Sequence, residues 1–156
     1  MLPIHFFTIV CNGQPFIRHH FEVFRRLSVP WHWHVIEGVA ALRHDTAWSA
    51  GRGGAIPDEF KSSPLSNDGT TEYLDSIQKR APGQVTIYRK DRGQLWDGKR
   101  EMVTAPLANI RSPALFWQVD ADELWTIAQF EATHRLFAAH PDKSAARFAC
   151  RFFFGP

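Results

Sequence analysis

A nearly continuous run of β-branched and aromatic residues near the start of the chain constrains the fold most strongly. Residues 4–10 read Ile-His-Phe-Phe-Thr-Ile-Val. A strand that is covered on one side only alternates apolar and polar residues, whereas this run is mostly apolar on both sides. It therefore predicts a strand buried on both faces, as in a parallel sheet.

Apolar segments of strand type and of helix type alternate along the rest of the chain. Strands are predicted over residues 33–39, 85–88, 114–119 and 147–154. Apolar residues at helical spacing predict helices between Pro15 and Pro30 and over residues 71–80, 98–110 and 126–139, with a kink or early break at Pro106. This order predicts an α/β sandwich with a mainly parallel sheet.

The length of 156 residues suits a single domain, 1–156. Residues 43–67 contain three Gly, two Pro and four Ser, so they are predicted to form a long loop insertion. A loop of this length within a compact domain is typically functional.

Composition excludes several classes of protein. The net charge of +2 is too balanced for a dedicated nucleic-acid binder. No apolar run approaches the roughly 20 residues that a membrane-spanning helix needs, and no basic segment precedes an apolar one as in a signal peptide. Cys11 and Cys150 are too few for a disulfide scaffold or a four-cysteine zinc site, and we interpret both as core thiols. A cytoplasmic location is the simplest expectation.

Ligands of parallel α/β sheets bind beyond the carboxyl ends of the strands, so the polar residues there are the candidates. Asp120-Ala121-Asp122 directly follows an apolar strand, and two such carboxylates suit Mg²⁺ or Mn²⁺. Two solvated acids at a strand-to-helix turn explain the pattern equally well. Asn12, Glu37 and residues 89–92 follow the other strands.

The remaining candidates each have a structural alternative. Glu37 has the position to accept hydrogen bonds from a base or ribose, but a surface acid is the favoured interpretation. Residues 67–72, Asn-Asp-Gly-Thr-Thr-Glu, either cap a helix or present amides to phosphate. Lys99 and Arg100 stand at a helix start, where the macrodipole disfavours cations by up to about 1 kcal/mol unless an anion binds. His32 and His34 share a strand face, where satisfied histidines are favoured over metal ligands.

Several motifs, taken in order, resemble one family. They are Phe7-Thr8-Ile9-Val10-Cys11-Asn12, the turn at residues 67–72, Gly98-Lys99 and, 22 residues after that glycine, the acidic triplet Asp120-Ala121-Asp122. This arrangement resembles the family 2-type glycosyltransferases with the GT-A fold, including their DXD motif. Residues 31–38 and 96–102 are similar to a bacterial branch of that family.

The resemblance implies a metal-dependent, inverting transfer of a sugar from a nucleotide-diphosphate sugar, expected to be a UDP-sugar, to an unknown acceptor. It implies a Mn²⁺ or Mg²⁺ cofactor. The implied roles are Thr8 and Asn12 in the base pocket, Glu37 facing the base, Lys99 at the diphosphate or ribose, Asp120 at the ribose or metal, and Asp122 on the metal. Asp68 is the alternative to Glu37 for the role at the end of the second strand.

Two departures from the family pattern leave alternatives open. Residues 39–67 separate the second strand from the Asp68 turn, which follows that strand directly in most relatives. The general base belongs to the acceptor half of the family's fold, with which no part of this chain corresponds, so the catalytic residue is unknown and the chain is expected to be an N-terminal portion. The alternative is a truncated or degenerate non-catalytic module for nucleotide binding or interaction. A nucleotidyltransferase is a weaker third hypothesis.

Overall fold

A four-stranded parallel sheet forms the centre of the computed structural model, which describes residues 2–41 and 56–151. The strands lie in the order β3-β2-β1-β4, and all three neighbouring pairs are parallel. Their bounds are β1 (Ile4–Val10), β2 (Trp31–Glu37), β3 (Val85–Tyr88) and β4 (Leu115–Gln118). The prediction of an α/β fold with a parallel sheet is confirmed, and β1 lies inside the sheet as its apolar sequence indicated.

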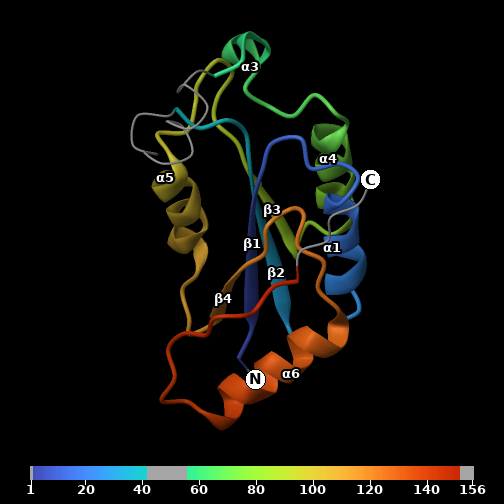
Figure 1. Cartoon of the computed structure of the whole chain (residues 1–156), viewed down its shortest axis with the longest axis vertical. Helices are drawn as coiled ribbons and strands as arrows, with labels where there is room; N and C mark the ends of the chain where they lie inside the picture. The colour runs from blue at the N-terminus through green and yellow to red at the C-terminus, as the bar shows by residue number, and fades with distance from the viewer. Residues whose placement is uncertain (1, 42–55, 152–156) are drawn as a thin grey trace.

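Helices cover both faces of this sheet. Figure 1 shows α1 (Ile17–Phe24) and α4 (Thr70–Arg80) on one face, α5 (Lys99–Thr104) on the other, and α6 (Ile127–Ala139) at the end where β1 begins. The short helix α3 (Asp58–Ser62) lies beyond the carboxyl ends of the strands. No helix within the described residues is both long and apolar enough to cross a membrane.

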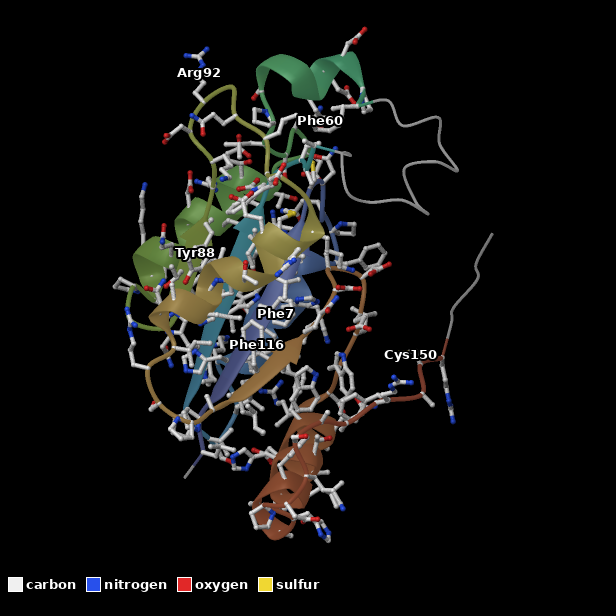
Figure 2. The ribbon with its side chains drawn as sticks, turned by 90° about the vertical axis from the view of Figure 1, so that its left-hand side faces the viewer. Phe7, Phe60, Tyr88, Arg92, Phe116 and Cys150 are labelled. Atoms are coloured by element: carbon white, nitrogen blue, oxygen red, sulfur yellow. The ribbon has the colours of Figure 1, made fainter. Side chains whose placement is uncertain are left out.

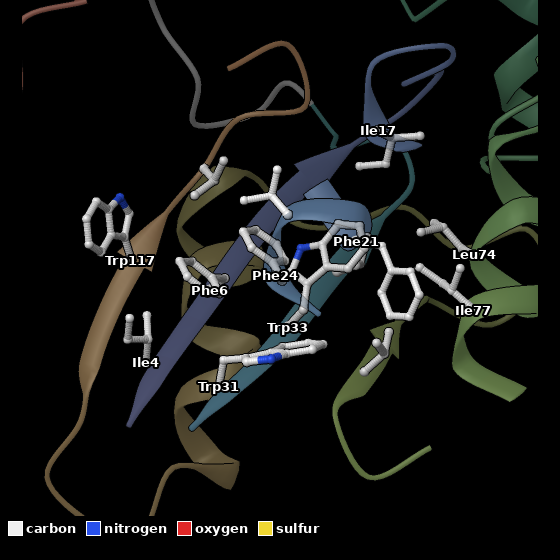
Figure 3. Packing of buried hydrophobic residues seen from close by; sticks show 14 of the residues in the cluster. Ile4, Phe6, Ile17, Phe21, Phe24, Trp31, Trp33, Leu74, Ile77 and Trp117 are labelled. Carbon is white, nitrogen blue, oxygen red and sulfur yellow. The ribbon is translucent and has the colours of Figure 1, made fainter. Parts of the chain in front are cut away.

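The larger core lies between the sheet and helices α1, α4 and α6. Successive residues of a strand point to opposite faces, and Phe6 and Trp33 both point to this one. Phe6 stacks on Phe24 of α1 with ring centroids 4.0 Å apart, and Phe130 of α6 meets Phe6 edge-on at 4.9 Å (Figure 3 shows the first of these pairs). This packing fixes α1 on the sheet, and the loops at its ends with it.

A smaller apolar cluster lies under α5 on the opposite face. It consists of Phe7, Ile36, Trp96 and Met102. Phe7 stacks on Phe116 of β4 with centroids 4.3 Å apart (Figure 2). The predicted break at Pro106 is confirmed, because α5 ends at Thr104 and a 3-10 helix, Ala105–Asn109, follows.

Several sequence-based expectations were wrong. Residues 58–62 form α3 inside the segment predicted to be loop, while residues 43–55 of that segment lie outside the described residues. Residues 147–151 belong to no strand of the sheet, and Phe148 contacts it through its side chain, which stacks on Trp117; residues 152–154 lie outside the described part. Cys150 is exposed and Cys11 only half-buried, so the expectation of two core thiols was wrong.

Candidate functional site

The carboxyl ends of the four strands meet at one edge of the sheet because all four are parallel. The chain runs outward from β1 to β2 and β3 and then returns to place β4 on the other side of β1. The direction of winding therefore reverses between β1 and β4, which is where parallel α/β sheets generally bind ligands. The residues that follow these two strands, from Asn12 and from Asp120 onward, flank this point.

The Glu37 carboxylate at the end of β2 is fully buried and held by three partners. Its Oε1 accepts hydrogen bonds from the Thr71 hydroxyl at 2.5 Å and the Ser66 backbone N–H at 3.3 Å. Its Oε2 accepts one from Arg89 Nε at 2.7 Å. The resemblance implied a role at the nucleotide base for Glu37; the structure places its carboxylate inside the protein, tying the 66–71 turn to the sheet.

Arg89 directly follows β3 and completes this buried network. Its Nη1 donates to Asp75 Oδ1 at 2.6 Å and its Nη2 to the Thr71 carbonyl at 3.4 Å. Burial by itself lowers the pKa of Arg89, but its bonds to Asp75 and Glu37 outweigh that effect and raise it above its ordinary value. Sequence reasoning marked residues 89–92 only as polar residues after a strand and missed this role.

The turn that contains Asp68 lies directly against the end of β1. Asn12 and Asn67 exchange hydrogen bonds of 2.8 and 2.9 Å. Asp68 Oδ2 accepts from the Gln14 backbone N–H at 2.9 Å. Asn12 has a φ of 59°, a conformation that asparagine tolerates better than most residues. The long insertion therefore does not separate Asp68 from the strand ends, because it returns the chain to the same edge.

Local hydrogen bonds stabilise the ionised form of Asp68. Burial alone raises the pKa of a carboxyl group, but bonds from Thr70 and from the Gln14 amide outweigh this and lower the pKa of Asp68. Its Oδ1 accepts the Thr70 N–H at 3.0 Å. Gly69 is the N-cap residue of α4, in the left-handed conformation, and it has no side chain that could accept a hydrogen bond from the first turn. The preceding residue, Asp68, provides that acceptor instead.

The acidic turn after β4 lies beside the β1 loop. A Cβ built on Gly13 would stand 3.6 Å from the Ala121 Cβ, so the residue between the two aspartates packs against that loop. Asp120 is half-buried and its Oδ1 accepts from Gln118 Nε2 at 2.8 Å. Asp122 is exposed, and within the described chain no hydrogen bond or ion pair engages its carboxylate.

Thr8 and Lys99 are the two remaining predicted site residues. The Thr8 hydroxyl is fully buried and accepts a hydrogen bond from Trp33 Nε1 at 3.0 Å, on the α1 face of the sheet. Lys99 is exposed at the start of α5, where it forms no hydrogen bond or ion pair with the residues described.

The strand histidines form a hydrogen-bonded chain that reaches Tyr88 of β3 and Asn109 of the 3-10 helix. His5 Nδ1 lies 2.8 Å from His34 Nε2, and His34 Nδ1 lies 2.9 Å from the Tyr88 hydroxyl, which accepts from Asn109 Nδ2 at 2.9 Å. Burial lowers the pKa of His34 to about 3. Over residues 2–41 and 56–151, no group of three or more His, Cys, Asp or Glu is arranged to hold a metal. The interpretation as satisfied histidines therefore fits better than a metal site.

The histidines of α1 contact the acidic turn. His20 Nε2 donates to the Glu123 carbonyl at 3.2 Å, and His19 Nε2 to the Trp125 carbonyl at 3.0 Å. His19 is exposed, whereas His20 is 2% exposed, and burial lowers its pKa to about 4.

Comparison with known proteins identifies no relative of this chain. No protein-family model, curated protein sequence or solved structure matches it. The functional argument therefore depends on the geometry of the strand ends and on the chemistry of the side chains there.

Proposed function

We propose that this chain is the donor-binding part of a glycosyltransferase of the GT-A type, and that it binds a nucleotide-diphosphate sugar at the carboxyl edge of the sheet. The observation that carries the proposal is the position of Asp120 and Asp122. They follow β4 at the point where the winding of the sheet reverses, and Ala121 between them packs on the β1 loop. In open parallel α/β sheets, ligands such as nucleotides generally bind at this point.

The carboxylates at this edge fit a divalent cation. Asp122 is exposed and its carboxylate forms no hydrogen bond or ion pair within the described chain, while Asp120 has one oxygen bonded to Gln118. Mg²⁺ is commonly held by one or two carboxylates together with phosphate oxygens, so a site with no third ligand among residues 2–41 and 56–151 is compatible with such binding. A cation bound there would act as a Lewis acid toward the departing diphosphate.

The neighbouring residues have roles that follow from their contacts. The Asp68 turn is held against the end of β1 through Gln14, so the exposed Asp68 is a further acid that a nucleotide could meet at this edge. Glu37 contributes indirectly, because its buried carboxylate anchors that turn through Thr71 and Ser66. Sugar transfer itself requires a carboxylate or histidine that deprotonates the acceptor hydroxyl, and we assign that role to none of the described residues.

Calorimetric titration of UDP tests the proposal. We expect wild-type protein to bind UDP with Mn²⁺ and to lose that binding in EDTA. Asp122→Ala removes a charged ligand, so it should weaken binding by about tenfold or more. Asp142→Ala, at an exposed carboxylate beyond α6, is the matched control and should bind as wild type does.

Folded wild-type protein that binds neither UDP nor GDP with Mn²⁺ would refute the donor site and leave the non-catalytic interaction module as the better hypothesis. Binding that survives both EDTA and Asp122→Ala would place the nucleotide elsewhere on the chain.

A further inference from the structure

Two consecutive histidines of α1 hold the backbone of the acidic turn at two points. His20 donates to the Glu123 carbonyl at 3.2 Å and His19 to the Trp125 carbonyl at 3.0 Å. Both acceptors lie on the turn, two residues apart. Together the two bonds fix the orientation of the segment that directly follows Asp122, since a single bond would leave it free to pivot.

The helix that carries these histidines is itself firmly placed. Ile17 and Phe24 of α1 are essentially inaccessible to solvent, and Phe24 stacks on Phe6 of the central strand. The two bonds therefore connect the acidic turn to the most rigid part of the core.

The hydrogen bonding of His20 argues that this contact is more than packing. The bond to a carbonyl requires the proton on Nε2, which leaves Nδ1 as an acceptor. That Nδ1 is buried and no described residue donates to it. Buried polar atoms normally have a hydrogen-bond partner. A leucine at this position would fill the space between Phe24 and Trp33 and would leave no buried polar atom without a partner. The presence of a buried imidazole at this position is therefore explained by the hydrogen bond from its Nε2 to the Glu123 carbonyl.

The rest of the turn is closed by its own side chains. Glu123 Oε2 accepts the Asp120 N–H at 3.1 Å, and the Glu123 N–H donates to the Asp120 carbonyl at 3.0 Å. Glu123 thus connects Asp120, through these two hydrogen bonds, and Asp122, as its neighbour in the chain, to the bond from His20. A displacement of the Glu123 carbonyl would move the backbone on which Asp120 and Asp122 stand.

We propose that His19 and His20 form a two-point clamp that positions Asp120 and Asp122 for a divalent cation and its nucleotide. This inference rests on the proposed function, and it makes the two histidines positioning residues that act through the turn. Groups that orient metal ligands typically change metal affinity by about 10- to 100-fold when they are removed.

The test compares two substitutions of His20 that differ only in whether a donor remains. His20→Leu keeps the volume and removes the donor, while the amide nitrogen of His20→Gln takes the place of Nε2. We expect His20→Leu to weaken binding of UDP with Mn²⁺ about tenfold or more, and His20→Gln to stay within about threefold of wild type. Amide hydrogen exchange at Glu123 should be faster in His20→Leu and restored in His20→Gln.

His134→Leu is the matched control. His134 is also buried, at 7% exposed, and its Nε2 bonds the Leu2 carbonyl at 2.8 Å, but it lies on α6. Its removal should cost stability and leave the affinity for UDP and Mn²⁺ unchanged. If His20→Leu does not fold, the exposed His19→Ala decides the question, with an expected loss of about two- to tenfold for one hydrogen bond.

The outcomes separate this inference from the proposed function. Wild type that binds UDP with Mn²⁺, together with a folded His20→Leu or His19→Ala variant that binds equally well, refutes the clamp alone. An equal loss in His134→Leu would also refute it, since the effect would then be general destabilisation. Wild-type protein that does not bind UDP with Mn²⁺ refutes the proposed function and, with it, the proposed role of the two histidines.

Discussion

At the scale of single residues, the most consequential contact is the ion pair between Glu37 and Arg89. The Glu37 side chain is fully buried, whereas Arg89 is 25% and Asp75 44% exposed. A buried carboxylate that loses its cation remains desolvated and uncompensated, which costs far more than the loss of an exposed pair. The loss of stability when one partner is removed therefore depends on whether the charge that remains is buried or exposed to solvent.

We expect Arg89→Met to lower the free energy of unfolding by about 3 kcal/mol, because Glu37 would stay buried with only Thr71 and Ser66 as donors. Urea unfolding measures this loss. Asp75→Ala is the control, with an expected cost of less than about 1 kcal/mol because that pair is largely solvated. Equal losses for the two variants would contradict this account of the network.

At the scale of elements, the exit from β2 is set by a glycine. Gly38 has a φ of +126°, and a Cβ there would stand 3.0 Å from the Pro64 carbonyl oxygen and 3.3 Å from Trp96 Nε1. The strand predicted over residues 33–39 consequently ends at Glu37. This close approach brings Pro64, and the turn that follows it, to the end of β2.

Gly38→Ala should therefore destabilise the protein by about 1–3 kcal/mol from backbone strain, with a further loss from the contact with Pro64. Thermal unfolding followed by circular dichroism is the measurement. Gly93→Ala is the matched control, because Gly93 also has a positive φ, of +80°, but has no atom within 4 Å of the added Cβ. A Gly38→Ala variant no less stable than Gly93→Ala would show that the close approach is unimportant.

At the scale of the whole molecule, buried histidines on both faces of the sheet link stability to pH. Burial lowers the pKa of His20 to about 4 and that of His34 to about 3, and it also lowers the pKa of His5 and of His32. An unfolded histidine has a pKa near 6.5. Below that pH the unfolded chain binds protons that the folded chain does not, so acid favours unfolding.

We expect stability to be fully present above about pH 6.5 and to fall as the pH decreases toward 4, by about 2 kcal/mol for each of His20 and His34 at pH 5. Urea unfolding at pH 7, 6 and 5 measures this dependence. The free energy of unfolding of His34→Gln should depend less steeply on pH than that of wild type. His140→Gln, at an exposed position, is the control and should keep the wild-type dependence. A profile of His34→Gln as steep as that of wild type would contradict the prediction.

The sequence by itself determined the class of fold and the places along the strands where the candidate side chains stand. The apolar run at residues 4–10, with the alternating helical segments, was sufficient for a parallel α/β sheet, and the break at Pro106 followed from the missing N–H of proline. The position of Glu37 at a strand end and of Asp120 and Asp122 just after one followed in the same way. These are local properties, because hydrophobic periodicity reports which way neighbouring side chains point.

Only the tertiary structure decided which of these side chains meet. Glu37 and Arg89 are 52 positions apart, Gln14 and Asp68 are 54 apart, and His20 and Glu123 are 103 apart. Periodicity carries no information about partners at such separations. They are set by the strand order, which places β2 between β1 and β3 and returns β4 to the far side of β1. That order buries Glu37 as an anchor, brings Asp68 to the end of β1 and turns His20 toward the acidic turn.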